Sequence, residues 1–501
     1  MIFVARTMAR RGLLTPGPPH RVARQFAALH KWKFGLAGEL RQAAARSPSR
    51  VALIDEGGPV TYGELLDRTA RLAGALPVAP GDRVGILARN STAMVEALIG
   101  VATLGANPVL MNTGLSSGQL AAVTRDQQLR LLIHDPAFTP PQGVPVLPLG
   151  QISYAAPLTK PPARPGRTII LTSGTTGVPK GAQRPTPSGF RPLCSIIDRI
   201  PLTAGIRMFI AAPLFHAWGF AGLQMALALR ATAVLRPRFE PADALETLAA
   251  HDCAAMIAVP VMLQRIMEQP AREVPLRIAA VSGSALPGGL ATRFMDRYGE
   301  VVYNLYGSTE ASWASIATPA DLRAAPNTAG RPPHGTIVEA LDEHGRPVPR
   351  GTPGRLFVGN EMLFEGYTNG ATRELHKGLL ATGDLGHVDE AGRVFVDGRQ
   401  DDMIVSGGEN VFPSEVEDVL AARPEVREVA VIGVADEQYG QRLAAYVVLH
   451  DGAELTAEAV RDHVRAELAR FSVPRDVVFR PELPRNATGK ILKRLLADEQ
   501  A

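Results

Sequence analysis

The chain has 501 residues, of which 46% are apolar and 20% are charged, with a formal net charge of +4. Its length exceeds one ordinary hydrophobic core and its composition is that of a globular protein, so we expect at least two domains. The weak net charge and the lack of a basic-aromatic stripe exclude a nucleic-acid-binding protein. Because two cysteines cannot build a disulfide framework and no run of about 18 apolar residues occurs, the sequence predicts a cytoplasmic protein without a membrane-spanning helix.

The N-terminal segment has an unusual charge balance. Residues 1–38 carry seven arginines or lysines and no acidic residue. Such a segment suits a mitochondrial transit peptide, a membrane-surface helix over residues 21–34, or a plain surface helix of an arginine-rich protein. The sequence leaves these alternatives open, and with them peripheral contact with a membrane. We treat residues 1–38 as a basic N-terminal extension.

Apolar strands and helices alternate from Val51 onward. A helix behind a threonine N-cap is predicted over 61–76, a strand over 83–87 and a helix over 92–103. Residues 135–166 hold nine prolines and predict a surface crossing between two sheet units. The crossing ends at a strand predicted over 168–171. Beyond it a second series begins, with strands predicted over 208–212, 233–235, 255–259, 277–281 and 301–305 and helices over 241–250 and 286–298. Two such series predict a pair of doubly wound α/β units, whose ligands bind at the carboxyl ends of the strands.

The pattern changes twice toward the C-terminus. Glycine-rich β segments at 330–335, 354–359 and 394–398 predict a small β-barrel or edge sheet, which completes a large domain over 39–398. The order then becomes helix, two strands and helix, over 413–422, 427–433, 443–449 and 456–470. We therefore expect a separate α+β domain over residues 399–501.

One ten-residue string carries the clearest chemistry. The string TSGTTGVPKG, Thr172–Gly181, follows the predicted buried strand 168–171. Its glycines let backbone N–H groups approach a ligand, its hydroxyls add donors, and Lys180 supplies a mobile point charge. Together these groups suit the phosphates of a nucleotide. The string differs from the GxxxxGK[ST] phosphate loop because a glycine follows the lysine.

This string, read against the whole length, resembles the adenylate-forming superfamily, which contains acyl-CoA synthetases, aryl-CoA ligases, luciferases and peptide-synthetase adenylation domains. The resemblance runs from about residue 40 to the C-terminus and includes TYGEL at 61–65 and GANPVLMNT at 105–113. It implies a small domain that rotates between two half-reactions, ATP and CoA as co-substrates, and Mg²⁺ as cofactor.

Polar residues at later strand ends fit the resemblance. In YGSTE, Tyr306 can stack on a purine, Thr309 can bond a phosphate oxygen and Glu310 can ligate Mg²⁺. In TGD, Asp384 can accept hydrogen bonds from the ribose hydroxyls, and Arg399 can reach the same ribose or the α-phosphate. The nucleotide site that the resemblance implies comprises Thr172, Ser173, Gly174, Thr175, Thr176, Gly177, Lys180, Ser284, Ala285, Asn304, Tyr306, Gly307, Ser308, Asp384 and Arg399.

Positions near the C-terminus bear on the two half-reactions. The resemblance makes Asp401 the hinge and places Gly407 and Gly408, in SGGEN, beside the channel for the pantetheine of CoA. Some relatives carry lysine where this chain has Gly407, so a side-chain contact to CoA is absent here. Lys490, in a glycine-flanked loop, would bridge the carboxylate and the α-phosphate during adenylation. The implied catalytic set is Lys490, Thr309, Glu310 and His216.

The acid pocket decides which member of the superfamily this is. The resemblance implies a lining of His216, Trp218, Gly219, Pro260 and Leu305. Amino-acid-activating relatives place aspartate where this chain has His216, and no carrier-protein segment follows, so an amino acid and a peptide-synthetase module are disfavoured. The lining is apolar and PLFHAWGF resembles bacterial fatty-acyl-CoA ligases. The expected substrate is therefore a medium- or long-chain fatty acid.

The sequence thus predicts ATP-dependent activation of a carboxylic acid to acyl-AMP with release of diphosphate, followed by transfer of the acyl group to CoA with release of AMP. In-line attack on the α-phosphorus needs positioning and charge neutralisation more than a protein nucleophile. Two alternatives stay open: an aryl- or other carboxylate-CoA ligase, and an acyl-AMP ligase that loads a carrier protein. A nucleotide-binding regulator without catalysis is disfavoured by intact Lys180, Glu310, Asp384, Arg399 and Lys490.

Overall fold

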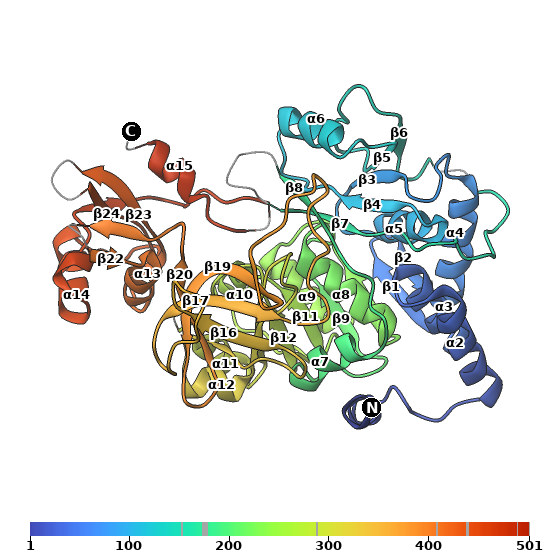
Figure 1. The fold of residues 1–501 in the computed structure, drawn as a ribbon, viewed down its shortest axis with the longest axis horizontal. Helices are drawn as coiled ribbons and strands as arrows, with labels where there is room; N and C mark the ends of the chain where they lie inside the picture. Colours follow the sequence, from blue (N-terminus) through green and yellow to red (C-terminus); the bar gives the residue numbers. More distant parts are fainter. Residues whose placement is uncertain are drawn as a thin grey trace.

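Two bodies of unequal size make up the computed structural model, which describes residues 1–151, 154–172, 179–286, 289–406, 409–436, 440–487 and 489–499. The larger body contains three sheets, and the smaller body contains the fourth sheet, at the left of Figure 1. Two parts of the predicted site, 173–177 in the phosphate loop and 407–408 beside the pantetheine channel, lie outside the described residues.

The first sheet of the large body has six strands in the order β6-β5-β3-β4-β7-β8. Its strands are β3 (Arg83–Leu87), β4 (Asn107–Leu110), β5 (Leu131–His134), β6 (Val146–Pro148), β7 (Ile169–Thr172) and β8 (Lys180–Gln183), and its sequence neighbours include α4 (Tyr62–Ala75), α5 (Thr92–Leu104) and α6 (Ser117–Asp126). All neighbouring strands are parallel except β7 and β8. This antiparallel pair, which the sequence did not predict, sets Lys180 opposite Thr172.

The second sheet has eight strands in the order β14-β13-β12-β11-β9-β10-β1-β2, antiparallel only at its two edges. Its strands are β1 (Val51–Asp55), β2 (Gly58–Thr61), β9 (Arg207–Ile210), β10 (Thr232–Leu235), β11 (Ala255–Ala258), β12 (Ile278–Val281), β13 (Val302–Tyr306) and β14 (Ser315–Ala317). The helices along this part of the chain are α3 (Leu36–Arg46), α7 (Arg191–Arg199), α8 (Ala217–Ala228), α9 (Pro241–Ala250), α10 (Pro260–Met267), α11 (Leu290–Tyr298) and α12 (Pro319–Ala324). Strands β10, β11 and β12 are buried throughout because helices cover both faces of a parallel sheet.

Local sequence signals set the helix ends. The Thr61 side chain caps α4, and Glu64 completes a capping box by accepting a hydrogen bond from the Thr61 N–H. Gly105 ends α5 at φ 80°, in the left-handed region that favours glycine. The helix predicted over 61–76 and the strand predicted over 83–87 agree with α4 and β3 to within one residue.

The third sheet is antiparallel, in the order β15-β20-β19-β17-β16, with β18 paired to β19. Its strands are β15 (Thr328–Gly330), β16 (Ile337–Leu341), β17 (Gly354–Gly359), β18 (Leu375–His376), β19 (Leu379–Val388) and β20 (Val394–Arg399). Register shifts in β17 and β19 curl the sheet. Among the described residues β15 and β16 do not pair with each other, so the expected small barrel is an open, curled sheet.

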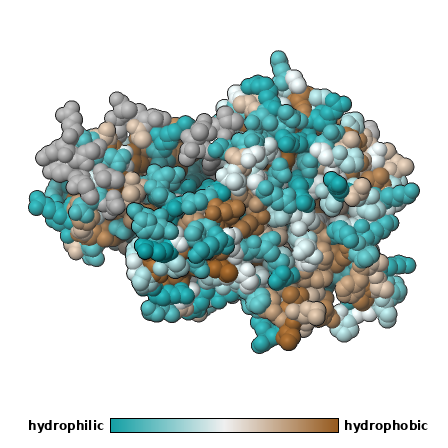
Figure 2. Space-filling view, in the orientation of Figure 1, coloured by the Kyte–Doolittle hydropathy of each residue, from teal (hydrophilic) through white to brown (hydrophobic). Residues whose placement is uncertain are grey.

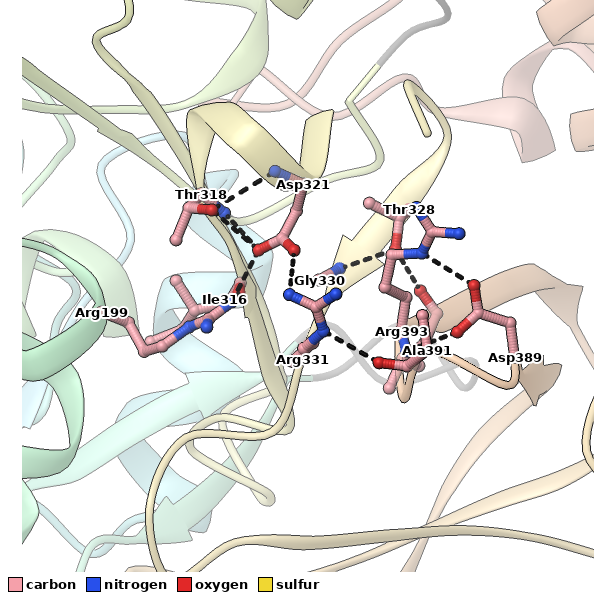
Figure 3. A network of polar contacts seen from close by, with 11 residues as sticks. Arg199, Ile316, Thr318, Asp321, Thr328, Gly330, Arg331, Asp389, Ala391 and Arg393 are labelled. Atoms are coloured by element: carbon pink, nitrogen blue, oxygen red, sulfur yellow. Dashed lines mark hydrogen bonds and ion pairs between the residues drawn. The ribbon is translucent and has the colours of Figure 1, made fainter. Parts of the chain in front are cut away.

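A buried ion-pair network fastens this third sheet to the eight-stranded sheet (Figure 3). Asp321 of α12 is 3% exposed and lies 2.7 Å from Arg199 of α7 and 2.7 Å from Arg331, which follows β15. Arg199 also donates to the carbonyl of Ile316 in β14, and Arg331 donates to the carbonyl of Ala391 before β20. A buried carboxylate is costly unless it is fully paired, so this network specifies how the two sheets sit together.

The smaller body has a sheet of its own, in the order β22-β21-β24-β23, with β25 beside β24. Its elements are β21 (Ile404–Ser406), β22 (Glu409–Val411), α13 (Pro413–Ala421), β23 (Val426–Asp436), β24 (Gly440–Leu449), α14 (Ala457–Glu467), a 3₁₀ turn (Arg470–Ser472), β25 (Asp476–Phe479) and α15 (Lys493–Asp498). Alternate residues of β23 and β24 feed two cores, one under α13 and α14 and one under α15. The body therefore contains its own hydrophobic core.

The basic N-terminal extension packs on the large body through α1 (Ile2–Arg10) and α2 (Pro19–Trp32). Arg11 donates to the carbonyl of Ile197 at 2.8 Å, and the guanidinium of Arg41 in α3 lies 3.4 Å from the centre of the Trp32 ring. Figure 2 shows apolar residues gathered at the lower edge of the molecule, where Figure 1 places α1. These contacts are those of surface helices. No helix among the described residues is long and apolar enough to cross a membrane.

Candidate active site

Polar residues gather where neighbouring strands of the eight-stranded sheet end. Tyr306 closes β13, Ser284 and Ala285 lie in the exposed loop after β12, and His216 lies in the loop after β9. Parallel strands end at one edge of a sheet, so these loops approach each other. At Gly283 (φ 103°) a Cβ atom would lie 3.2 Å from Cε1 of His216. Close contact between the two loops therefore requires glycine at this position.

Tyr306, Asp384 and Arg399 form one connected group. The Tyr306 hydroxyl donates to Oδ2 of Asp384 at 2.5 Å, and Nη1 of Arg399 lies 3.5 Å from Oδ1 of the same carboxylate. The pairing of β19 with β20 sets Asp384 opposite Arg399. Burial raises the pKa of Asp384, although Tyr306 and Arg399 both oppose the shift. A carboxylate held between a phenol and a guanidinium can accept hydrogen bonds from vicinal hydroxyls.

Glu310 is fixed from one side only. It is 4% exposed, and its Oε1 accepts a hydrogen bond from Tyr367 at 2.6 Å and lies 3.6 Å from Nη2 of Arg373. Its Oε2 has no hydrogen bond to the residues that the structure describes. The turn before it needs glycine, because a Cβ atom at Gly307 would lie 2.3 Å from the Ser312 carbonyl oxygen. Glu310 therefore offers one oriented carboxylate oxygen, as a hard cation requires.

The rest of this turn is held by side chains that hydrogen-bond to its backbone. Ser308 accepts a hydrogen bond from the Ala311 N–H at 3.0 Å, and Arg184 donates to the carbonyl of Thr309. Burial lowers the pKa of Arg184 to about 10. The Thr309 hydroxyl makes no hydrogen bond to the described residues, which leaves it for a phosphate oxygen. Asn304, in β13, is buried.

The described ends of the phosphate loop lie beside this turn. Thr172 closes β7 and donates to the Lys180 carbonyl at 3.3 Å. The Lys180 ammonium lies 5.8 Å from the centre of the Tyr367 ring, whose hydroxyl binds Glu310. One tyrosine thus connects the lysine of the loop with the carboxylate of the turn.

The predicted acid pocket is compact. His216 caps α8 by accepting a hydrogen bond from the Trp218 N–H, and burial lowers the pKa of His216 to about 4, so the ring is neutral at pH 7. The Trp218 indole donates to the carbonyl oxygens of Ala258 at 3.1 Å and Ala280 at 3.3 Å, at the ends of β11 and β12. The remaining members, Pro260, Leu305 and Gly219, are buried, and a Cβ atom at Gly219 would lie 2.2 Å from the Pro213 carbonyl oxygen.

The loop that carries Lys490 lies against the large body. A Cβ atom at Gly489 (φ 82°) would lie 2.6 Å from Cγ1 of Val261 in α10. The Lys490 N–H donates to the Asn486 side chain at 2.9 Å. Burial acts to raise the pKa of Asp401, but Arg399 and then Lys490 lower it. The lysine loop therefore lies against the large domain, close to the Arg399 and Asp401 pair.

Three residues at the site escaped the sequence prediction: Arg184, Tyr367 and Arg373. Arg184 supports the turn through Thr309, whereas Tyr367 and Arg373 hold Glu310. Arginines are so common in this chain that two more carry no signal, and Tyr367 lies in an aperiodic connection between strands. Only the spatial approach of the β8 end and the 360–373 segment to the turn reveals them.

Known proteins share both the sequence pattern and the fold. The AMP-binding enzyme family matches residues 40–368, and the AMP-binding enzyme C-terminal domain matches residues 415–490. Feruloyl-CoA synthase of Amycolatopsis sp is 33% identical over 90% of this chain and 96% of the relative, and indoleacetate–CoA ligase of Aromatoleum aromaticum is 31% identical over 90% and 95%. The structure of o-succinylbenzoate CoA synthetase from Bacillus subtilis with its acyl-adenylate intermediate aligns at a TM-score of 0.80 and 30% identity, over 91% of this chain and 97% of that one.

The two family matches together reach both bodies of the structure. The chain therefore belongs to the AMP-binding enzyme family, as an acyl-CoA synthetase of the adenylate-forming superfamily.

Proposed function

We propose that this enzyme activates an aromatic carboxylic acid with ATP and transfers the aryl-acyl group to CoA. The observation that carries the choice of acid is the set of relatives that align over nearly the whole chain. Their names give feruloyl, indoleacetate and 2-succinylbenzoate as the acids activated. They favour the aryl alternative over the unbranched fatty acid that the apolar pocket residues predicted.

The setting of Trp218 supports a short, flat substrate. The indole is hydrogen-bonded to two strand ends, and Gly219 beside it is closed off by the Pro213 carbonyl. A flexible chain of many methylenes would need open space at these positions, whereas an aromatic ring can stack on a fixed aromatic wall. Neutral His216 adds an uncharged polar edge to the same pocket.

In this proposal the nucleotide is held by residues of the large domain. Asp384 accepts from the ribose hydroxyls, Arg399 lies beside it toward the α-phosphate, and Tyr306 stacks on the adenine. Thr309 and Lys180 donate to phosphate oxygens. All of these groups act by positioning and by neutralising charge, so that the acid's own carboxylate attacks the α-phosphorus in line.

The residues present fit a magnesium ion. No group of three or more metal-binding side chains occurs among the described residues, and Glu310 offers a single oriented oxygen. Mg²⁺ is commonly held in this way, by one or two carboxylates with substrate phosphates and water. Bound with the phosphates, the ion would offset their negative charge. Glu310 would supply the protein's carboxylate ligand to the ion, and Tyr367 and Arg373 keep that carboxylate in place.

Lys490 serves only the first half-reaction in this proposal, and Asp401 is the hinge that removes it afterward. Proline at Asp401 would fix φ and obstruct rotation. We expect Asp401→Pro to form acyl-adenylate and release diphosphate in a single turnover, but to make little acyl-CoA. Equal loss of both steps would mean that Asp401 is structural.

A diphosphate-release assay tests the choice of acid. The panel contains benzoates, phenylacetates and cinnamates against saturated acids from octanoate to palmitate, first without and then with CoA. We expect kcat/KM for the best aromatic acid to exceed that for the best fatty acid at least tenfold, which corresponds to about 1.4 kcal/mol. A preference for fatty acids would reject the proposed substrate, and adenylate that is never passed to CoA would reject the acceptor.

A further inference from the structure

One face of α10 lies against the small body. Val261 and Gln264 are three residues apart in this helix, so their side chains lie on the same face. A Cβ atom at Gly489 would lie 2.6 Å from Cγ1 of Val261. The side-chain amide of Gln264 donates to the carbonyl oxygen of Arg427, in β23, at 2.6 Å. The face therefore contacts two segments of the small body, the first residues of β23 and the loop that carries Lys490.

An irregularity of β23 makes the Arg427 carbonyl available. Between Val426 and Glu428 the strand advances by two residues while its partner β24 advances by one, which makes Arg427 the extra residue of a β-bulge. A bulged residue is left out of the hydrogen bonds of the ladder, so its carbonyl oxygen can accept from outside the sheet. Gln264 supplies that donor from the large body. One hydrogen bond thus links the two bodies at this point.

The Lys490 loop is fixed to the same strand by Arg485. Nη1 of this arginine donates to the Gly489 carbonyl at 2.6 Å, and its Nη2 lies 2.8 Å from Oε2 of Glu428. Only 18% of the Arg485 side chain and 13% of the Glu428 side chain are exposed, so salt screens this ion pair little. Glu428 follows Arg427 in β23. The strand end that Gln264 holds is therefore connected through one ion pair to the loop that carries Lys490.

We propose that α10 is the surface on which the small body docks for adenylation, and that Gln264 is a positioning residue that stabilises this orientation. The inference rests on the proposed rotation of the small domain and names a contact that distinguishes its two orientations. Gln264 acts through Lys490, because the Lys490 loop lies on Val261 while β23 lies against α10. Rotation about Asp401 carries β23 away from α10, so the hydrogen bond of Gln264 is broken before the acyl group passes to CoA.

A bond made in only one orientation changes the balance between the two. The balance shifts by the difference in the free energy of the bond between the orientations, and one intramolecular hydrogen bond typically contributes a factor of about five. Each half-reaction proceeds in proportion to the population of its own orientation. The ratio of the adenylation rate to the acyl-transfer rate therefore carries the full factor, whichever orientation is more populated. A residue needed only for folding would lower both rates and leave the ratio unchanged.

Gln264→Met tests the contact, because methionine has a similar length and no N–H donor. Adenylation is measured as diphosphate release in a single turnover without CoA, and acyl transfer as formation of acyl-CoA from preformed acyl-adenylate. Both measurements use the acid of the panel above that is activated best. A failure of the proposed aromatic substrate would therefore show in the panel and leave this test intact.

We expect the ratio of the two rates to fall about fivefold in Gln264→Met. Gln269→Met is the matched control, because this residue follows α10 and its side chain makes no hydrogen bond to a described residue. The control should keep the ratio of the wild type. An unchanged ratio in Gln264→Met would overturn the inference.

The hinge variant gives a second measurement. Asp401→Pro is expected to hold the small body in the adenylation orientation, so the hydrogen bond of Gln264 has no equilibrium left to shift there. We expect the double variant with Gln264→Met to release diphosphate as fast as Asp401→Pro alone. Slower release would mean that Gln264 supports Lys490 or the fold directly, and would overturn the inference. If Asp401→Pro loses both steps, the proposed hinge fails, and the ratio in Gln264→Met alone decides.

Discussion

Glu310 and Lys490, both proposed to act in adenylation, are held in opposite ways. Glu310 is buried at the end of a parallel strand and is oriented by Tyr367 and Arg373, both from the same large body. Lys490 is exposed, its backbone is tied to Asn486 within its own loop, and that loop touches the large body at Val261. The carboxylate is thus held within the large body, whereas the lysine belongs to the small body and only its loop lies near the large one.

The difference indicates which residues can take part in one half-reaction only. If the small domain turns between the half-reactions as proposed, a side chain of the large domain keeps its place, but one on the small domain cannot hold the α-phosphate in both orientations. Substitutions in the two regions should therefore fail differently. In the large domain they should disturb nucleotide or ion binding, and at the lysine loop they should remove one chemical step.

The largest effect is expected at Lys490. Lys490→Ala should slow adenylation about 10²–10³-fold, as when one preorganised charge-stabilising donor is removed. With preformed acyl-adenylate the same variant should make acyl-CoA near the normal rate. Lys493→Ala is the matched control, because that lysine pairs with Glu417 within the small body at 2.7 Å. If Lys490→Ala slowed both half-reactions equally, Lys490 would not be confined to adenylation, and the proposed difference between the two regions would be wrong.

On the rigid side, His216 should make stability depend on pH. Its folded pKa is lowered to about 4 by burial, against about 6.5 in an unfolded chain. Between pH 6.5 and pH 4 the His216 ring is therefore protonated in the unfolded state and neutral in the folded state. Stability is full above pH 6.5 and falls by about 3 kcal/mol as the pH drops from 6.5 to 4. The free energy of unfolding, measured with denaturant across this pH range, should depend less steeply on pH in His216→Asn than in the wild type. Asparagine keeps a helix-capping acceptor. Identical slopes would place the wild-type ring in contact with water.

A smaller effect is expected from a substitution that disturbs the contact between the Lys490 loop and the large body. Gly489→Ala introduces a Cβ atom 2.6 Å from Val261 and strains a residue at φ 82°, which costs about 1–2 kcal/mol for an L-residue. Because the loop would have to move from the large body, we expect adenylation to slow about tenfold. Gly452→Ala has the same kind of strain (φ 76°) with nothing within 4 Å, so it should leave adenylation unchanged. Equal slowing in both variants would point to strain alone.

The smallest effect is expected at Tyr367. Tyr367→Phe removes one hydrogen bond from Glu310 while Arg373 remains, a loss of about 1 kcal/mol. Adenylation should slow about fivefold, and half-maximal activity should require more Mg²⁺. Tyr298→Phe is the control, since that buried hydroxyl has no partner among the described residues. An unchanged Mg²⁺ requirement in Tyr367→Phe would mean that Glu310 does not bind the ion.

Much of the scaffold could be predicted from local signals. The Thr61 cap and the short apolar runs predicted their elements closely, because each depends on neighbours in the chain. The small barrel was predicted less well: whether a curled antiparallel sheet closes depends on its edge strands and bulges, and the glycine pattern specifies neither. The sequence also gave no sign of the Asp321 network that holds this sheet to its neighbour.

By itself the sequence determined the reaction class. The lysine loop, the YGSTE turn, the TGD strand and the C-terminal lysine follow one another at the spacing of adenylate-forming enzymes, and each motif is a local requirement of backbone shape or charge. Only the tertiary structure decided what surrounds them. It set Arg184, Tyr367 and Arg373 beside the turn and fixed the Trp218 indole across two strand ends. These contacts join residues far apart in the chain, so packing of the sheets, and no sequence neighbour, creates them.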